Sequence, residues 1–307
     1  MKFETGIIAG PTAVGKSAVA QLIAERNGAA VLSADSMLVY KGMDVGTAKP
    51  TVAERGAVPY YGIDCVGAGK PFSVGDWLGC IKRELSATPP PAGGIVTAGG
   101  TGMYLRALLS GLDSSPSNAE VRAKWEGVFA EGGIDALVAA VEERGCGDLL
   151  APGDRANPRR VIRALELHEC GGSRELWRDL KHLPVIACLR MDRLQLASRI
   201  ARRVEQMFAN GLVEEALALR KDGMSRTAFG AIGYAEALAF ADGELTREEA
   251  AERICARTRQ LAKRQMTWFR GQLKVAWIDV ADGASTESVA SAVEEVWRRH
   301  GKSRIEI

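Results

Sequence analysis

The first third of the chain alternates between short apolar runs and amphipathic stretches. Apolar runs of strand length cover residues 6–9, 29–33 and 94–98. Helical periodicity and strong helix formers are found in residues 17–26, in residues 72–87 and in the stretch that ends at residue 109. Strands that alternate with helices predict an α/β fold with a doubly wound parallel sheet.

The pattern changes in the middle of the chain. Between residue 111 and about residue 184, amphipathic stretches are separated by Gly and Pro, and no run is typical of a strand. Asn157 followed by Pro158 predicts the start of a helix that continues to about residue 170. Residues 185–191 then form an apolar run that returns to the sheet. We therefore expect a core of residues 1–112 and 185–307, and a helical insertion domain of residues 113–184.

Long helices are predicted for the last third of the chain. Asp192 can cap a helix that reaches residue 210, and a second helix covers residues 212–221. Thr246 and Glu249 have the spacing of a capping box for a helix that runs to residue 270. Apolar residues recur every seven positions on its expected buried face: Ile254, Leu261 and Trp268. Its second half has no acidic residue and these basic ones: Arg253, Arg257, Arg259, Lys263, Arg264 and Arg270.

Composition is that of an ordinary globular protein. Hydrophobic residues make up 47% of the 307 positions and charged residues 25%, which argues against a disordered or fibrous chain. The net charge of +2 is too small to predict a polyanionic partner by itself. The places where basic residues cluster are therefore more informative than their total.

The cysteines and the apolar segments indicate the compartment. No two of the six cysteines form a C-x-x-C pair, and the chain has only three histidines, so the spacing argues against structural zinc and a disulfide framework. The apolar run near the N-terminus is shorter than a signal peptide needs, and no stretch reaches the length of a membrane span. We expect a reduced, cytoplasmic, soluble protein that does not associate with membranes.

Residues 10–17 match the phosphate-binding pattern G-x-x-x-x-G-K-[ST] between a predicted strand and a predicted helix. Backbone N–H groups of such a loop approach phosphate oxygens, Lys16 supplies a positive charge, and the Ser17 hydroxyl can ligate Mg²⁺. The core is therefore of the P-loop type. The pattern indicates phosphate without saying which nucleotide or other diphosphate is bound. The residues expected at the phosphate are Gly10, Pro11, Thr12, Ala13, Val14, Gly15, Lys16 and Ser17.

Polar residues follow two other predicted strands. Asp35 comes directly after the second strand, at the sheet edge where open α/β proteins bind ligands. It is a candidate reactive carboxylate, although a carboxylate in an Asx turn or at a helix N-cap would have the same position. Residues 99–102, Gly-Gly-Thr-Gly, follow the third strand, and the hydroxyl of Thr101 could face the same anion. By itself this second pattern is weak, because Gly-rich turns after strands are common.

Two basic clusters could face a phosphate backbone. One is the acid-free half of the last long helix, and the other contains Arg159, Arg160 and Arg163 in the insertion. A solvated charged face explains such clusters equally well.

Six motifs together resemble those of the tRNA dimethylallyltransferases, also called tRNA isopentenyltransferases, in their bacterial form. They are GPTAVGKS from residue 10, SADSMLVYKGMDVGTAKP from 33, GGTGMYLRALLSGL from 99, RRVIRALE from 159, AIGYAEAL from 231 and TRQLAKRQMTWFR from 258. The resemblance is collinear from about residue 6 to residue 280. The chain departs from the family where Tyr60 and Tyr61 replace histidines, in the shorter stretches 145–156 and 171–184, and in having no C-terminal zinc-finger extension.

The resemblance implies an activity. The phosphate loop would hold dimethylallyl diphosphate, with Lys16 and Mg²⁺ neutralising the leaving diphosphate. Asp35 would act as general base toward the exocyclic N6 of the adenine beside the anticodon, and Thr101 would hydrogen-bond the diphosphate. The basic helix that ends at residue 270 would add phosphate contacts.

The resemblance also implies a partner, the anticodon stem-loop of tRNA, whose adenine must leave its stack to reach the donor. A cleft between core and insertion would suit this, and we expect the protein to act as a monomer. Met37 and Leu38 could equally be core residues. The positions that match tRNA contacts in the family are Asp35, Ser36, Met37, Leu38, Arg122, Arg159, Arg160, Val161, Ile162 and Arg163.

Two other functions are compatible with parts of the sequence. The main alternative is a P-loop small-molecule kinase in which the Arg-rich insertion is a lid over ATP. It uses the phosphate loop but leaves the distal motifs without a role, and its required Walker-B aspartate has only Asp64 as a poor candidate. The other alternative is a nucleotide-switched RNA-binding module, which would not need the carboxylate of Asp35 at the phosphate site.

Overall fold

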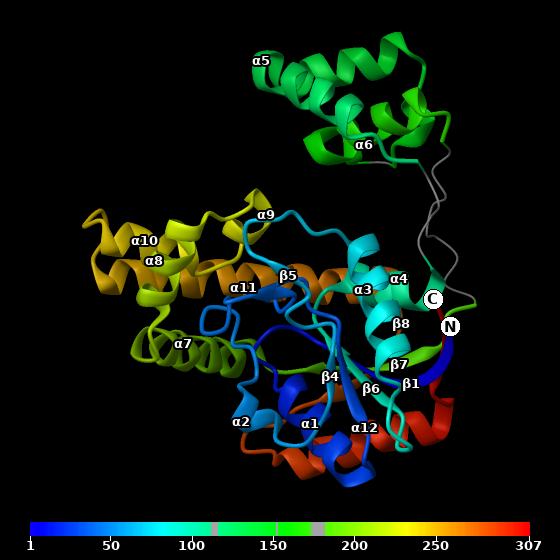
Figure 1. The fold of residues 1–307 in the computed structure, drawn as a ribbon, viewed down its shortest axis with the longest axis vertical. Helices are drawn as coiled ribbons and strands as arrows, with labels where there is room; N and C mark the ends of the chain where they lie inside the picture. The colour runs from blue at the N-terminus through cyan, green and yellow to red at the C-terminus, as the bar shows by residue number, and fades with distance from the viewer. Residues whose placement is uncertain (112–115, 152, 173–181) are drawn as a thin grey trace. The chain divides into compact units, whose positions relative to one another are not determined.

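The computed structural model describes residues 1–111, 116–151, 153–172 and 182–307. The chain divides into two compact units (Figure 1). The larger consists of Met1–Gly111 with Leu180–Ile307, and the smaller of Leu112–Asp179. The boundary expected after residue 112 lies outside the described residues.

A mainly parallel sheet forms the centre of the larger unit. Its order is β4-β2-β6-β1-β7-β8, and neighbours in this order run parallel. Its strands are β1 (Lys2–Ala9), β2 (Ala30–Ser33), β4 (Tyr60–Tyr61), β6 (Ile95–Gly99), β7 (Val185–Arg190) and β8 (Lys274–Asp279). The chain leaves β1 toward one edge and later returns to its other side at β7, so the order reverses at β1. In open α/β sheets this switch point is where ligands bind.

Helices cover both faces of the sheet, which confirms the doubly wound α/β fold (Figure 1). Side chains alternate along β1, so that Ile8 packs beneath α1 (Lys16–Asn27) and α12 (Thr286–His300), while Ile7 faces the opposite core. The helices of that opposite core are α3 (Val74–Ala87), α4 (Gly102–Ser110), α7 (Arg193–Ala209), α8 (Leu212–Asp222), α9 (Arg226–Phe229), α10 (Tyr234–Ala241) and α11 (Arg247–Gln272). The short helix α2 (Val52–Arg55) has no buried residue.

Two helices start at their predicted capping residues, α7 at Asp192 and α11 at Thr246, and Ser73 caps α3 in the same way. Each side chain accepts a hydrogen bond from a backbone N–H group of the first turn. The seven-residue repeat in α11 is only partly confirmed. Ile254 is fully buried, whereas Leu261 and Trp268 are half-buried.

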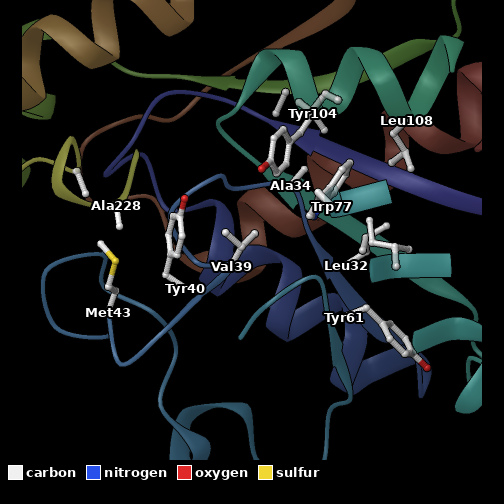
Figure 2. Close-up of a cluster of buried hydrophobic side chains, with 14 of the residues drawn as sticks. Leu32, Ala34, Val39, Tyr40, Met43, Tyr61, Trp77, Tyr104, Leu108 and Ala228 are labelled. Atoms are coloured by element: carbon white, nitrogen blue, oxygen red, sulfur yellow. The ribbon is translucent and has the colours of Figure 1, made fainter. Parts of the chain in front are cut away.

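Aromatic packing fixes the end of β2. Trp77 of α3 and Tyr104 of α4 stack with ring centroids 4.4 Å apart (Figure 2). The indole N–H of Trp77 donates to the carbonyl of Ser33, the last residue of β2, at 3.2 Å. This buried contact holds the point from which the chain continues to Asp35.

The N-terminal strand is longer than its apolar run predicts. Residues 2–5 are mostly polar, yet they form the first half of β1 because they pair antiparallel with β9 (Ser303–Glu306). Hydrophobicity could not reveal this extension, since its partner lies at the other end of the chain. A separate pair of two-residue strands, β3 (Tyr40–Lys41) and β5 (Val66–Gly67), lies outside the main sheet.

The smaller unit is helical, as expected, and its described residues contain no strand. Its elements are α5 (Ala119–Glu143), which Gly133 interrupts at φ 66°, the 3₁₀ turns η1 (Gly147–Leu149) and η2 (Asp154–Ala156), and α6 (Pro158–Glu169). Trp125, Leu137 and Leu165 belong to its small core. Asn157 is the N-cap residue of α6 and Pro158 its first residue, as predicted, and the Asn157 side chain makes no capping hydrogen bond.

Candidate active site

Three loops meet at the carboxyl edge of the sheet. Ala9 of β1 pairs with Gly99 of β6, and Ala98 of β6 pairs with Ser33 of β2, so these three strands end side by side. The phosphate loop follows β1, Asp35 follows β2, and the Gly-Gly-Thr-Gly turn follows β6. Parallel register therefore brings together the three segments that the sequence singled out.

The phosphate loop curls at the N-terminus of α1. The backbone φ angle is 66° at Ala13 and 107° at Gly15, values that residues other than glycine rarely adopt. Turns of this kind direct successive backbone N–H groups into one concavity, and the helix terminus adds partial positive charge. Gly10, Pro11 and Val14 are buried and shape the loop. The others line a pocket of about 360 Å³: Thr12, Ala13, Gly15, Lys16 and Ser17.

Lys16 is set for a phosphate ligand. Its ammonium donates to the carbonyl of Pro11 at 2.7 Å across the loop. Burial lowers the pKa of Lys16 to about 8, with Asp35 opposing this shift and Arg203 adding to it. An incoming diphosphate would raise the pKa of Lys16 again, because an anion within a few ångströms favours the protonated form.

Two arginines of α7 also reach the pocket, and the sequence analysis did not assign them. Arg203 donates to the Thr12 hydroxyl at 3.3 Å and to the Thr47 carbonyl at 2.9 Å, and Arg199 donates to the Val14 carbonyl at 3.3 Å. Desolvation lowers the pKa of Arg203. Its Nε is buried without a hydrogen-bond partner in the described part of the chain. The sequence signal that could have identified them is their four-residue spacing, which puts both arginines on one face of a helix.

Helix α11 reaches the phosphate loop through an amide and not through a charge. Gln265 accepts a hydrogen bond from the Thr12 N–H and donates one to the Gly100 carbonyl, both at 2.9 Å. Five of the six basic residues in this half of α11 are exposed, and the sixth, Arg257, pairs with Glu236. The phosphate contacts that were expected of the basic residues of α11 therefore stay a prediction.

The Gly-Gly-Thr-Gly turn packs tightly against the end of β2. A side chain at Gly99 would bring its Cβ to 2.1 Å from the Ala34 carbonyl oxygen, which leaves room only for glycine. The Thr101 N–H donates to that same carbonyl at 3.2 Å. Close backbone approach thus explains why a glycine stands in this motif.

Asp35 faces the pocket together with Lys16 and Arg203. One carboxylate oxygen accepts the Met37 N–H at 2.9 Å, which is the Asx turn that was weighed as the alternative role. The turn uses one oxygen and is compatible with a reactive role for the other, which stays a prediction. No hydrogen bond to the second oxygen is seen among the described residues.

The neighbours of Asp35 have mixed positions. The Thr101 hydroxyl accepts from the Ser36 N–H at 3.0 Å and lies 3.2 Å from the Ser36 hydroxyl. Leu38 is buried and lines the pocket, and Met37 is half-buried against the core. These contacts leave the diphosphate role of Thr101 and the tRNA roles of residues 36–38 as predictions.

The segment after Asp35 is anchored by buried Lys49 and half-buried Glu215. The Lys49 ammonium contacts Asp44 at 2.7 Å, Asp64 at 2.6 Å and the Tyr40 carbonyl at 2.7 Å. Glu215 of α8 accepts the backbone N–H groups of residues 44–46 and the Tyr234 hydroxyl. This anchoring places Thr47, Ala48 and Pro50 in the pocket wall. It also gives the motif around Tyr234 a structural purpose.

In the smaller unit, a buried carboxylate organises the arginines. Glu166 is fully buried and pairs with Arg122 at 3.0 Å and Arg163 at 2.7 Å. Burial would raise the pKa of Glu166, but hydrogen bonds from Arg163, Asn118 and Arg122 lower it. Arg160 pairs with buried Asp154, and Arg159 is exposed.

Val161 and Ile162 are buried in the core of the same unit. Their side chains therefore cannot offer a surface to tRNA in this arrangement. Contact of these two positions with tRNA stays a prediction.

Oxygen donors that could hold a divalent cation lie on the pocket wall. Ser17 is exposed at the first turn of α1, and Asp35 stands across the pocket. A hydroxyl and one carboxylate beside a phosphate site are the hard ligands with which proteins bind Mg²⁺, so the donor set fits this ion.

Comparison with known proteins gives consistent matches. The family model "IPP transferase" matches residues 38–272, and the model "Isopentenyl transferase" matches residues 3–60. The chain is 38% identical to a tRNA dimethylallyltransferase of Limosilactobacillus fermentum, covering 94% of this chain and 97% of the relative. It is 36% identical to a protein of the same name from Geobacillus kaustophilus, covering 97% and 96%.

Solved structures give the same result. The full-length tRNA isopentenylpyrophosphate transferase of Bacillus halodurans superimposes with a TM-score of 0.62 at 32% identity, over 96% of this chain and 98% of that one. A eukaryotic dimethylallyltransferase acting on tRNA shares the fold, with a TM-score of 0.74 at 22% identity over 97% and 80% of the two chains. No helix in the described residues is both long and apolar enough to cross a membrane. These matches, which agree with a phosphate loop that shares its pocket with Asp35, show that the chain belongs to the IPP transferase family.

Proposed function

We propose that this protein transfers a dimethylallyl group from dimethylallyl diphosphate to N6 of the adenine next to the anticodon in tRNA, releasing diphosphate. One observation carries the proposal: a phosphate loop, two arginines and the carboxylate of Asp35 line a single pocket. The loop and the arginines suit a diphosphate leaving group, and the carboxylate suits a nucleophile that must lose a proton. Membership of the IPP transferase family supports the same reaction.

The leaving diphosphate gains negative charge as the allylic C–O bond breaks. The loop residues that line the pocket, together with Arg199 and Arg203, surround the position that it would occupy. Fixed charges in a partly buried site stabilise such a developing charge without reorganising.

The Ser17 hydroxyl would hold Mg²⁺ beside the diphosphate. The ion supplies additional positive charge to the leaving group. The protein's own groups perform the remaining steps.

The acceptor nitrogen is a weak nucleophile, because its lone pair is delocalised into the adenine ring. A new C–N bond forms as the C–O bond breaks, and the proton of N6 passes to the Asp35 carboxylate. The Asx turn occupies one oxygen of Asp35, and the other oxygen would accept this proton. The dimethylallyl carbon passes from oxygen to nitrogen, diphosphate leaves with the electron pair of the C–O bond, and Asp35 holds the proton.

The acceptor base must be extruded from its stack before it can enter a pocket of this size. Arginines of the insertion would bind the tRNA backbone, with Arg159 the most available among those described. We further propose that the protein is cytoplasmic, where tRNA is modified, and works as a monomer.

The kinase alternative is not favoured. Its candidate Walker-B residue, Asp64, contacts the Lys49 ammonium at 2.6 Å and so serves the anchoring of residues 40–50. The third alternative, an RNA-binding module without chemistry, gives no role to the carboxylate at the phosphate site.

The test uses radiolabelled dimethylallyl diphosphate or ATP, each with and without tRNA. We expect tRNA-dependent transfer of label from the prenyl donor into RNA, and no comparable turnover of ATP. Robust ATP hydrolysis without transfer from dimethylallyl diphosphate would reject the proposal.

A further inference from the structure

A cluster of two thiols and a carboxylate lies outside the pocket of the proposed reaction. Cys65 follows β4 in the loop before β5, while Cys80 and Glu84 stand one turn apart on α3. The three ligand atoms lie within 4.8 Å of one another, and Cys80 is buried with Cys65 and Glu84 half-buried. The spacing in the sequence, which argued against zinc, could not reveal this group, because only the fold brings residue 65 to α3.

We propose that Cys65, Cys80 and Glu84 form a binding site for one thiophilic divalent cation of the Zn²⁺ type. Two sulfur ligands and one oxygen ligand suit zinc, whose structural and catalytic sites are mostly tetrahedral, and a solvent molecule would complete the coordination. Metal binding would displace the thiol protons to solvent, and no oxidant or reductant is needed.

The distances within the cluster fit this coordination. Bonds of about 2.3 Å to sulfur and about 2.0 Å to oxygen at a tetrahedral angle place the two atoms about 3.5 Å apart. The Cys80 sulfur is 3.5 Å from Oε1 of Glu84. These two ligands come from positions i and i+4 of one helix, which are neighbours on its surface.

The carboxylate is already oriented. Oε2 of Glu84 accepts the Gly62 N–H at 2.8 Å, which leaves Oε1 directed at the thiol. Hydrogen bonds of this kind to the outer atom of a ligand are typical of built metal sites.

The site would join the loop after β4 to α3. Asp64, next to Cys65, holds Lys49, and the N–H groups of Asp64 and Val66 donate to the carbonyls of Leu38 and Val39 at 3.1 Å. A cation bound at Cys65 would therefore stabilise the segment that follows Asp35 from outside the reaction pocket. Its role would be structural, since the three ligands do not line the reaction pocket.

The experiment measures metal binding by the full chain, reduced with a phosphine and freed of metal, without tRNA or prenyl donor. Zn²⁺ affinity is measured by competition with a chromophoric chelator, and Co²⁺ reports the ligands by its thiolate charge-transfer and tetrahedral d–d absorption. We expect one ion per chain and both cobalt signatures. Because no substrate is present, the result is independent of the proposed transfer reaction.

Variants decide which residues bind. Cys65→Ser and Cys80→Ser should each weaken Zn²⁺ binding at least about 10-fold and remove most of the charge-transfer band, and Glu84→Gln should weaken it about 10-fold. Cys170→Ser, a half-buried cysteine of the smaller unit, is the matched control and should bind as the unchanged protein does. Zinc should raise the Tm of the control and not that of Cys80→Ser.

Binding that is unchanged in both Cys65→Ser and Cys80→Ser, or no binding above the chelator's competition range, would overturn the proposal. So would a Cys65–Cys80 disulfide that persists in the reduced protein by mass spectrometry. If Cys80→Ser does not fold, Cys65→Ser and the cobalt spectrum of the unchanged protein decide the question.

Discussion

The carboxamide oxygen of Gln265 accepts a 2.9 Å hydrogen bond from the backbone N–H of Thr12, 253 positions earlier in the chain. The amide nitrogen of the same side chain donates to the Gly100 carbonyl. One neutral side chain of α11 therefore ties the phosphate loop to the turn after β6, and an amide can do this because it both donates and accepts.

Replacing Gln265 should loosen the donor site more than it weakens the fold. Gln265→Ala removes both hydrogen bonds, and Gln265→Glu leaves a carboxylate that cannot donate to the Gly100 carbonyl and repels diphosphate. We expect KM for dimethylallyl diphosphate to rise about 10-fold or more, as loss of roughly 1.4 kcal/mol implies, and more in the Glu variant. Steady-state kinetics measures this.

The control for Gln265 is Gln260→Ala on the exposed face of the same helix, which should leave KM unchanged. If Gln265→Ala kept a normal KM for the donor, the bridge would be only a packing feature of the fold.

Lys16 should give the reaction an upper pH limit. Its ammonium is charged below its pKa of about 8 and loses its charge as the pH rises. The kcat/KM for the prenyl donor, which reports the free enzyme, should therefore fall as pH increases through about 8. Lys16→Ala should abolish transfer at every pH.

Stability should rise with pH over the range in which Lys16 loses its charge. The folded pKa is depressed from 10.5, so the unfolded chain binds more protons between pH 8 and 10.5. Stability of the unchanged protein relative to Lys16→Met should rise across this window. A relative Tm that falls with pH there, measured in matched buffers without substrate, would contradict the assigned burial of Lys16.

Asp35→Asn should separate chemistry from binding. The asparagine can keep the Asx turn by accepting the Met37 N–H through its carbonyl oxygen, but it removes the base. We expect kcat to fall by at least about 10²-fold with tRNA affinity little changed, because general-base contributions run to about 10²- to 10⁴-fold. Single-turnover transfer and filter binding measure the two quantities.

Near-normal single-turnover transfer by Asp35→Asn, with weaker tRNA binding, would make Asp35 a positioning residue and the mechanism above wrong.

Arg159 and Arg163 should behave differently although they lie on one helix. Arg159 is exposed, so Arg159→Ala should weaken tRNA binding, with the log-log salt slope falling by roughly 0.9 or less per lost phosphate contact, and leave stability unchanged. Arg163→Ala also strips a partner from fully buried Glu166 and should lower the Tm of the insertion. Tm and salt-dependent affinity of the two variants are compared.

Glu166 sets the direction of the accompanying pH effect. Its folded pKa is lowered, so the stability it contributes is present above its ordinary pKa and is lost as pH falls through the folded value. The Tm difference between Arg163→Ala and the unchanged protein should shrink on acidification below about pH 4.5.

A tRNA affinity that did not vary with salt would reject the electrostatic account of tRNA binding.

The sequence by itself determined the parts of the site that are local. The phosphate loop needs only a strand, a glycine-rich turn and a helix start within one short segment, and its pattern was complete in residues 10–17. Strand ends predicted from apolar runs also placed Asp35 and Thr101 at the same sheet edge, since parallel strands end together. The family resemblance added chemical roles that the geometry supports for Lys16 and Asp35.

Only the tertiary structure decided which distant residues complete the site. Arg203 and Gln265 reach Thr12 across 191 and 253 positions, and neither belongs to a phosphate pattern that can be recognised from spacing. Val161 and Ile162 lie between arginines in the sequence, yet the helix turns their side chains into the core of the smaller unit. Cys65 and Cys80 meet because α3 packs beside β4. Periodicity reports which face of an element is buried, but which groups share that buried space depends on how the elements pack.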